Sequence, residues 1–420
     1  MNARRTLALF AAAALGLALL LALAVWVLDR PGDLPPPAAG PADPARGEYL
    51  ARVGHCAGCH TARGGAAYAG GGAVATPFGT VYAANLTPDP ATGIGRWTEQ
   101  DFRRALHEGR GSGGRRLVPA CPYPNFTRVD AADLRDLYAW LRTLPPVAQP
   151  NRPHALRFPY GTQAALAVWR ALYFRPGAPP RDPARSEAWN RGAYLVGGLA
   201  HCNACHGARN AWGATAGATD FSGAALPAHG WVAPALDDPH EAGVAGWSAA
   251  DVTALLADGR NAHASVSGPM AMVVARSTRF LNPADLAAIA EYLRSLPQRQ
   301  PERAEAEPPP PDVLAAGRRI YEDHCAGCHG GAGEGAAPMV PALAGNRALG
   351  LDSPANLLRV VLGGAFGPST PAHPRPFGMP PFANRLGNDE VAAVVTYLRW
   401  TWGPRASAVG PGDVDRARGG

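Results

Sequence analysis

The sequence contains no lysine, so all 39 of its basic side chains are arginines. Against 33 acidic side chains they give a formal net charge of +6 and a sequence pI of about 9.1. Nucleic-acid-binding surfaces are typically basic tracts interleaved with aromatic residues. The sequence has no such tract, so we expect no nucleic-acid partner.

Cysteine is scarce outside one repeated pattern. Of the 7 cysteines, all but Cys121 lie in three Cys-x-x-Cys-His motifs, so no pair is left for a disulfide. This motif attaches a c-type haem: the two thiols bond the porphyrin, and the histidine becomes an axial iron ligand. A thiol redox pair or half a zinc site could explain one Cys-x-x-Cys, but not three copies that each end in histidine.

The motifs therefore predict three covalently bound haem c groups. The attachment residues are Cys56, Cys59, Cys202, Cys205, Cys325 and Cys328, and the proximal ligands are His60, His206 and His329. Three haems carry six propionates, which bring the total charge close to zero. The charge thus gives no further indication of a partner.

One long apolar run lies near the N-terminus. Residues Thr6–Leu28 follow Arg4 and Arg5 and would form a helix of about 34 Å, long enough to cross a bilayer. Ala22–Ala24 resembles a signal-peptide cleavage site, but the length favours an uncleaved anchor. We expect an inner-membrane anchor with the haem domains in the periplasm. Residues 31–45 indicate a semi-rigid stalk that leads away from the membrane.

The remaining chain repeats one pattern of helices three times. Each unit opens with a helix that contains a glycine and closes with a helix that contains an aromatic residue, so the two backbones can cross closely. The opening segments are Arg46–Leu50, Arg191–Leu195 and Ala316–Tyr321, and the closing segments are Asp136–Arg142, Ile289–Arg294 and Val394–Arg399. A middle helix starts at the N-caps Thr98 and Ser248, ends at Gly109 and Gly259, and has Pro354 in its first turn in the third unit.

This pattern predicts a mainly α protein, with three tandem class I cytochrome c domains after an N-terminal transmembrane helix. Between the first two domains, Gln163–Phe174 indicates an apolar helix packed over the first domain, with a partner-docking or membrane-surface helix as the alternative. The glycine-rich run Gly64–Gly72 and the following Phe78–Tyr82 indicate a loop and a short hairpin. The expected division is a membrane anchor or signal segment (1–30), a stalk (31–45), domain 1 (46–150), a linker with the apolar helix (151–183), domain 2 (184–300), a Pro/Glu-rich linker (301–312), domain 3 (313–405) and a tail (406–420).

Methionine is the usual second axial ligand of an electron-carrying c-type haem, and the chain has only 5. Met379 lies in a proline-stiffened loop before the last closing helix and is the candidate for the third haem. Met339 lies too close to the third motif and is expected to fill the core. For the second haem we prefer Met270, which follows Gly-Pro, to Met272.

The first unit has no methionine, and Cys121 occupies the corresponding place. We favour ligation by its thiolate, which would stabilise ferric iron and lower the potential by hundreds of millivolts. Alternatively, Cys121 is a small apolar residue beside a five-coordinate iron, or His107 supplies the ligand. The expected metal ligands are therefore His60, His206, Met270, His329, Met379 and Cys121. A histidine also precedes each motif, and His55, His201 and His324 are either partners of haem propionates or partly exposed helix residues.

With these motifs the chain resembles the three-haem cytochrome c subunits of bacterial membrane-bound periplasmic dehydrogenases, which oxidise alcohols, gluconate, fructose, sorbitol or aldehydes. The resemblance is carried by Asn85–Asp89, Gly93–Thr98, Pro122–Pro124, Gly230–Pro234, Gly268–Ala271, Leu343–Asn346 and Met379–Phe382. It implies the same proximal histidines, with Met270 and Met379 as distal ligands. The family has Met-Pro-Tyr-Pro where this chain has Cys121–Pro124, so the first site departs from the pattern.

These features lead to a functional expectation. The chain shows no general acid–base set, so we expect no enzyme activity of its own and place substrate oxidation in a periplasmic dehydrogenase large subunit of the flavin, pyrroloquinoline quinone or molybdopterin type. The haems would pass electrons from it to membrane quinone or to another respiratory carrier such as a terminal oxidase. The alternative is a catalytic multihaem cytochrome that oxidises sulfur compounds at a haem ligated by His60 and Cys121. A haem-based sensor would need an output domain, and none is recognisable after Arg405.

Overall fold

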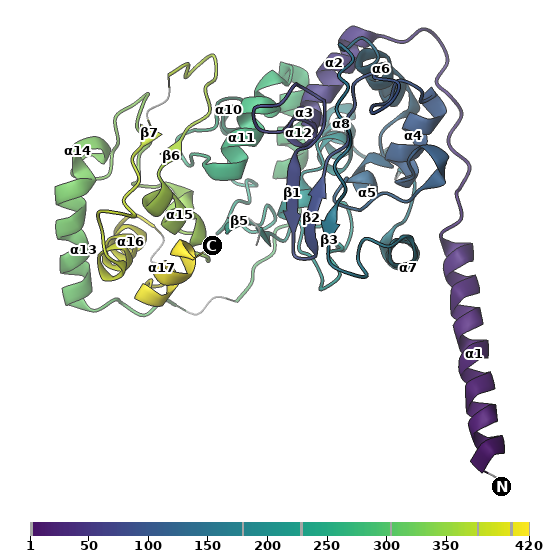
Figure 1. Cartoon of the computed structure of the whole chain (residues 1–420). Helices are drawn as coiled ribbons and strands as arrows, with labels where there is room; N and C mark the ends of the chain where they lie inside the picture. Colours follow the sequence, from purple (N-terminus) through teal and green to yellow (C-terminus); the bar gives the residue numbers. More distant parts are fainter. Residues whose placement is uncertain are drawn as a thin grey trace.

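The computed structural model describes residues 3–178, 180–226, 230–302, 305–375, 378–403 and 406–419. Arg405, the expected end of the third domain, lies outside these ranges. Figure 1 shows one long helix, α1, projecting from a body built of helices with a few short strands. The mainly α fold expected from the sequence is therefore confirmed.

Helix α1 spans Ala3–Leu28 and covers the whole apolar run. Within the described residues it is the one helix that is long and apolar enough to cross a membrane, over Arg5–Leu28, and none of that span is buried in the protein. An exposed apolar surface of this size is unfavourable in water. Length and composition fit both a membrane anchor and a signal sequence.

A buried carboxylate connects the end of α1 to the body. Asp29 forms ion pairs with Arg110 at 3.0 Å, with Arg116 at 2.5 Å and with Arg170 at 2.6 Å. Burial alone would raise the pKa of the Asp29 carboxyl, but the hydrogen bonds from Arg170 and Arg116 outweigh it and lower this pKa below its usual value. The carboxylate thus stays ionised where α1 meets the body.

The proline-rich segment after Asp29 is bound to the body by arginine side chains. Arg103 donates a hydrogen bond to the carbonyl of Pro35, and Arg135 donates one to the carbonyl of Ala39 at 2.7 Å. A proline-rich segment cannot pair its carbonyls within a helix of its own, so arginines of the body bind them instead. The segment consequently runs along the body, as Figure 1 shows.

Three repeat units follow, each with an opening helix, a short motif helix, a middle helix and a closing helix. The first repeat contains α2 (Pro44–Val53), α3 (Cys56–His60), α4 (Glu99–Glu108), α5 (Tyr123–Phe126) and α6 (Ala131–Leu141). The second contains α8 (Glu187–Tyr194), α9 (Asn203–His206), α10 (Ala249–Asp258), α11 (Gly268–Arg276) and α12 (Pro283–Arg294). The third contains α13 (Pro311–His324), α14 (Ala326–His329), α15 (Ala355–Gly363) and α16 (Asn388–Thr401), and α17 (Pro411–Arg418) packs on it.

The opening and closing helices cross at a glycine in every repeat, as the sequence predicts. A Cβ atom on Gly47, Gly192 or Gly317 would lie only 2.0, 2.1 or 2.2 Å from a carbonyl oxygen of the closing helix. The same hypothetical atom would lie 2.7 Å from the Cβ of the aromatic residue on that helix, which is Trp140, Tyr292 or Tyr397 in turn. Only glycine allows this approach, and the aromatic side chain packs beside the crossing.

The expected ends of the middle helices are also confirmed. The Thr98 and Ser248 hydroxyls accept hydrogen bonds from the third residue of α4 and α10, and Gly109 and Gly259 end these helices with φ of 58° and 77°. In the third repeat the helix begins one residue later than expected, so that Pro354 is the N-cap of α15. The apolar linker helix is α7 (Gln163–Tyr173).

Short antiparallel strands hold the loops between the helices. β1 (Ala73–Thr76) and β2 (Gly79–Tyr82) form the expected hairpin, and β3 (Ala155–Leu156) pairs with β2. In the later repeats β4 (Ala224–Leu226) pairs with β5 (Trp231–Ala233), and β6 (Ala365–Phe366) pairs with β7 (Gly378–Met379).

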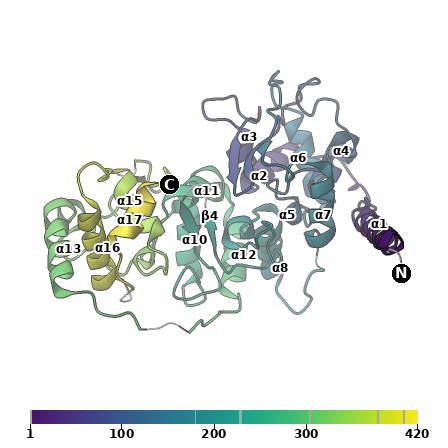
Figure 2. The same ribbon diagram turned by 60° about the horizontal axis from the view of Figure 1, so that its bottom comes forward.

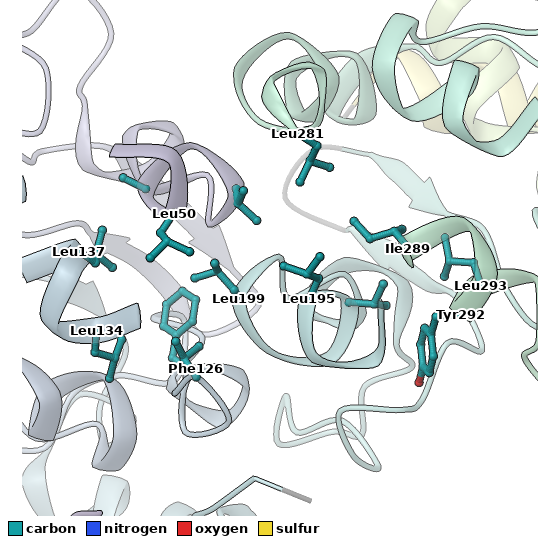
Figure 3. Close-up of a cluster of buried hydrophobic side chains, with 14 of the residues drawn as sticks. Leu50, Phe126, Leu134, Leu137, Leu195, Leu199, Leu281, Ile289, Tyr292 and Leu293 are labelled. Carbon is teal, nitrogen blue, oxygen red and sulfur yellow. The ribbon is translucent and has the colours of Figure 1, made fainter. Parts of the chain in front are cut away.

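Two hydrophobic cores organise the body. The first is shared by the first and second repeats, and Leu50, Leu195 and Leu199 meet in it with almost no exposure. Figure 3 shows Leu50 and Phe126 from the first repeat facing Leu199 from the second. The second core belongs to the third repeat and α17. The first two repeats thus form one packed unit, and the third packs separately.

The close helix crossing predicts that adding one methyl group to its glycine lowers the stability of the protein. We expect Gly317→Ala to lower the free energy of unfolding by about 3 kcal/mol, the upper end of the usual cost of overpacking, because the new Cβ collides with the Ala393 carbonyl. Guanidinium unfolding of the purified chain, followed by far-UV circular dichroism, measures the change. Gly331→Ala is the matched control, since its Cβ would meet no atom within 4 Å. Equal unfolding curves for the two variants would contradict the crossing.

Candidate haem sites

Each Cys-x-x-Cys-His motif forms a short helix directly after the opening helix of its repeat. In every motif the first cysteine is half-buried and the second is exposed. All six are free thiols, and none is paired with another cysteine. Each motif therefore presents two available thiols and one imidazole within little more than one helical turn. Such a set can bond the two vinyl groups of a porphyrin and ligate its iron.

A backbone carbonyl fixes each motif histidine. The Nδ1 atoms lie within hydrogen-bond distance of a carbonyl oxygen, at 2.7 Å for His60 and Ala84, 2.7 Å for His206 and Pro234, and 3.2 Å for His329 and Pro341. A carbonyl can only accept, so Nδ1 carries the proton and the lone pair is on Nε2. This tautomer and orientation suit an iron ligand.

These three carbonyls were not predicted from the sequence. Each belongs to a residue that stands two positions before a leucine, which is Leu86, Leu236 or Leu343. This repeated spacing was the available signal. It is a weak signal, because the backbone carbonyl acts whatever the side chain and the sequence distance to the histidine differs among the repeats.

The candidate methionine ligands lie on different kinds of element. Met270 stands in the first turn of α11 and is half-buried, whereas the Met272 side chain is 44% exposed. Met379 lies on β7, opposite Ala365, and packs against the core of the third repeat. Met339 is 46% exposed, so the expectation that it fills the core is wrong. It lies in a surface loop that does not reach that core.

Cys121 lies beside the first motif. Burial is the main cause that raises the pKa of its thiol to about 12, and the nearby charge of the Cys59 thiolate raises it further. Cys121 raises the pKa of Cys56 in the same way, after burial and Cys59. The structure thus brings Cys121 close to both attachment cysteines. Its thiol would lose the proton there only beside a strong positive charge such as an iron ion.

His107 has a different role from a ligand. It is buried on α4, and its Nε2 lies 2.7 Å from the Val129 carbonyl oxygen, to which it donates a hydrogen bond. Burial lowers the pKa of His107, so the ring is neutral at pH 7. We assign it to the packing of α4 against the segment before α6.

The histidines that precede the motifs differ from one another. His55 and His201 have left-handed backbones, with φ of 52° and 43°, and both are half-buried. Burial first, and then the charge of nearby His201, lower the pKa of His55 to about 4. The His55 Nδ1 is buried without a hydrogen-bond partner among the described residues, and the His201 ring stacks on Phe126 at 5.5 Å. His324 is exposed. The three histidines have equivalent positions in the sequence, but in the structure only His55 and His201 lie at the boundary between the first and second repeats.

Reciprocal hydrogen bonds join the first and second repeats. Tyr49 of α2 donates to Asp285 of α12 at 2.6 Å, and Tyr194 of α8 donates to Asp133 of α6 at 2.7 Å. Tyr49 and Tyr194 hold the same place after their crossing glycines, and the two aspartates are the third residues of their helices. The contact therefore has an approximate two-fold symmetry, in which each repeat gives and receives the same bond.

A second reciprocal pair lies deeper in the same interface. The Ser277 hydroxyl donates to the Val53 carbonyl at 2.9 Å, and the Asn125 amide donates to the Gly197 carbonyl at 2.8 Å. Gly197 belongs to a π-helical turn, Leu195–Leu199, which accommodates one residue more than the first repeat has at this place.

The two motifs consequently face each other. Burial raises the pKa of Cys59, and the charge of Cys205 in the second motif raises it further. Helix α11, which carries Met270, contacts the first motif helix α3 and also β6 of the third repeat. The second site therefore lies between the other two.

The third repeat contacts the second through polar groups. Asn356 accepts a hydrogen bond from the Val232 amide and donates one to the Val232 carbonyl, both at 2.8 Å. The Arg347 amide donates to the His263 carbonyl at 2.8 Å, and its guanidinium lies over the Trp247 ring at 4.8 Å. At the position of Tyr49, counted from the crossing glycine, the third repeat has an exposed arginine, Arg319. It thus lacks the tyrosine that joins the other two repeats.

The three repeats are also found when the sequence is compared with known proteins. The cytochrome c family model matches the chain three times, over residues 44–145, 190–297 and 314–402. The alcohol dehydrogenase (quinone) cytochrome c subunit of Gluconacetobacter polyoxogenes is 38% identical over 394 residues, which cover 89% of this chain and 82% of that protein. The chain belongs to the family of cytochrome c subunits of bacterial dehydrogenases.

Other dehydrogenase subunits have a similar sequence identity to this chain. The gluconate 2-dehydrogenase cytochrome c subunit of Pantoea cypripedii is 37% identical over 381 residues, covering 86% of each chain. A nicotinate dehydrogenase subunit of Pseudomonas putida is 41% identical over 360 residues, which are 84% of this chain. The match spans only 30% of that longer protein. Membership of the cytochrome c family implies covalently bound haem c.

The two-fold contact leads to a stability prediction. We expect Tyr49→Phe and Tyr194→Phe each to lower the free energy of unfolding by about 1.5–3 kcal/mol, because each removes a hydrogen bond to a charged carboxylate. Urea unfolding of the purified chain measures both. Tyr397→Phe is the control, since the Tyr397 hydroxyl makes no hydrogen bond to the described residues. Wild-type stability in both interface variants would contradict the reciprocal contact.

Proposed function

We propose that this chain is the electron-transfer subunit of a periplasmic dehydrogenase complex and carries three haem c groups. The observation that carries the proposal is the threefold occurrence of two free thiols beside a histidine whose Nδ1 is bound to a backbone carbonyl. Haem c, when bound, supplies reversible one-electron chemistry at its iron. Membership of the dehydrogenase-subunit family supports the same role.

The residues of each site follow from this proposal. The three repeats are tandem class I cytochrome c domains, with boundaries close to 46–150, 184–300 and 313–405. The attachment thiols would be those of the three motifs, and His60, His206 and His329 would bind iron through Nε2. Met270 and Met379 would complete the iron ligands of the second and third sites. The half-buried position of Met270 supports it over the exposed Met272.

The contacts between the repeats support an order for the sites. The first and second motifs face each other across a shared core, and α11 reaches from the first motif to β6 of the third repeat. We therefore place the second site in the middle of the electron path. The first repeat bears α1 and lies nearest to the membrane, and the third repeat lies at the opposite end of the body (Figure 1).

This order assigns the two ends. A periplasmic dehydrogenase large subunit, of the flavin, pyrroloquinoline quinone or molybdopterin type, delivers electrons at the third repeat. Membrane quinone or another respiratory carrier receives them at the first. The chain is held in the inner membrane by α1, with the three domains in the periplasm. Substrate oxidation belongs to the partner, so the chain alone is not an enzyme.

A tagged chain purified from its own cells tests this function. We expect it to contain three haems by pyridine haemochrome assay and to co-purify with a dehydrogenase large subunit, whose substrate reduces the haems. The double variant Cys325→Ala/Cys328→Ala should contain two haems, because the third site then has no thiols for attachment. Oxidation of an alcohol or aldehyde by the chain free of any partner would contradict the proposal.

Cys121 gives a separate prediction for the first site. We propose that the Cys121 thiolate would ligate the iron of the first site together with His60, supported by its place beside Cys56 and Cys59. Low-temperature electron paramagnetic resonance of the oxidised chain should show one low-spin signal typical of thiolate ligation and two typical of His/Met. Cys121→Met should replace the thiolate signal and raise the potential of this haem by hundreds of millivolts. Three His/Met signals in the wild-type chain would contradict the assignment.

The same variant tests the alternative of a catalytic cytochrome that oxidises sulfur compounds at His60 and Cys121. That function predicts turnover of thiosulfate by the wild-type chain and its loss in Cys121→Met. Electron transfer predicts no thiosulfate turnover in either protein. Family membership and the position of the second site support electron transfer.

A further inference from the structure

Helix α7 is inverted relative to an ordinary surface helix. Its arginine, Arg170, is buried and points toward the body, where it pairs with Asp29. Its outward positions are apolar and follow the helical spacing: Ala164, Val168 and Leu172 are exposed, the last two by 45% and 57%. A helix that faces water normally has the opposite distribution. The outer face of α7 is therefore suited to an apolar environment.

Two exposed aromatic residues lie near α7, one in the loop that leads into it and one beside it. Phe158, in the loop between β3 and α7, is 89% exposed, and Trp212 is 57% exposed. The Trp169 indole of α7 donates a hydrogen bond to the Trp212 carbonyl at 2.9 Å, so Trp212 lies beside the helix. We call Phe158, Val168, Leu172 and Trp212 the α7 surface. Soluble monomers rarely expose several large apolar side chains together unless they bind something.

The α7 surface adjoins the end of the apolar helix α1. The two helices are in contact, and the ion pair between Asp29 and Arg170 fixes α7 at the point where α1 ends. Both views show α7 beside the body-side end of α1 (Figures 1 and 2). Trp26 lies near that end, 56% exposed, with the Arg30 guanidinium 3.6 Å above its ring. Tryptophan and arginine are typical of a membrane–water boundary.

The positions of Trp26, Arg30 and α7 indicate what the α7 surface binds. If α1 crosses the membrane, Trp26 and Arg30 mark its outer boundary, and α7 lies at the same level. The segment after Asp29 is held along the body by Arg103 and Arg135, so it cannot raise the first repeat above the lipid. A face that continues directly from an anchor into aromatic and aliphatic side chains matches the headgroup–acyl boundary, which also binds amphipathic helices.

We propose that the α7 surface rests in the outer boundary of the same bilayer that α1 crosses. This inference depends on the membrane anchor in the proposed function. It orients the first repeat, because Trp169 of α7 packs on Tyr123, at a ring distance of 6.5 Å, two residues from Cys121. The first haem site is thereby held close to the lipid, where a membrane quinone is soluble. The surface is a positioning device and not a second anchor.

Photo-crosslinking in lipid vesicles tests the contact. p-Benzoylphenylalanine replaces Leu172 in the full haem-containing chain, which is inserted in vesicles of phosphatidylethanolamine and phosphatidylglycerol and irradiated. Mass spectrometry should find lipid adducts at position 172. The matched control places the same probe at Gln100, an exposed position at the start of α4. We expect no lipid adducts at that position.

Each outcome decides the proposal. Lipid adducts at position 172 and not at position 100 support it. Equal lipid adducts at both positions, or only adducts to protein at position 172, overturn it, the latter in favour of a partner or a second copy. If the chain floats with the vesicles but gives no lipid adduct at position 172, this surface is refuted and the anchor stands. A chain that does not float with the vesicles refutes both.

Discussion

The close crossing of two helices in each repeat is the contact on which the rest of the structure depends. Gly47, Gly192 and Gly317 bring the opening helix to van der Waals contact with the backbone of the closing helix. This contact sets the direction in which the opening helix leads into the Cys-x-x-Cys-His motif. The motif histidine then reaches the carbonyl that holds its Nδ1. A small repeat with few strands thus positions its motif histidine through one backbone contact and one hydrogen bond.

The opening and closing helices also join the first repeat to the second. The opening and closing helices of the first and second repeats exchange tyrosine–aspartate hydrogen bonds, and their leucines merge into one core. This packing is apolar and reciprocal, so the relative position of the first two sites is rigid. The third repeat has Arg319 where the others have tyrosine, keeps its own core and docks through polar groups. The body is therefore a tight pair with a third unit attached to it.

The membrane side of the molecule depends on a buried charge. Asp29 follows directly after the apolar run and is surrounded by Arg110, Arg116 and Arg170. An unpaired carboxylate would be costly at this depth, but three guanidinium groups compensate for its desolvation. Because Arg170 turns inward for this purpose, α7 exposes its apolar residues. The attachment of α1 and the apolar α7 surface thus have one physical cause.

The sequence alone determined the local features, because short motifs and helix patterns carry their own physical meaning. The crossing glycines, the caps Thr98 and Ser248, and the helix Gln163–Tyr173 could all be recognised from spacing and residue type. The family could be recognised as well, since its motifs extend over most of the chain. Met339 was misjudged, because an isolated methionine does not show its burial.

Only the tertiary structure decided how distant residues meet. Asp29 and Arg170, and Tyr49 and Asp285, are far apart in the chain, and no local pattern indicates that they are neighbours. The carbonyls of Ala84, Pro234 and Pro341 act through the backbone, so their side chains give no signal. The pairing of the first two repeats depends on which helix faces remain uncovered after each repeat has folded. Local sequence specifies the elements and their chemistry, but the energy of burying their remaining surfaces selects their arrangement.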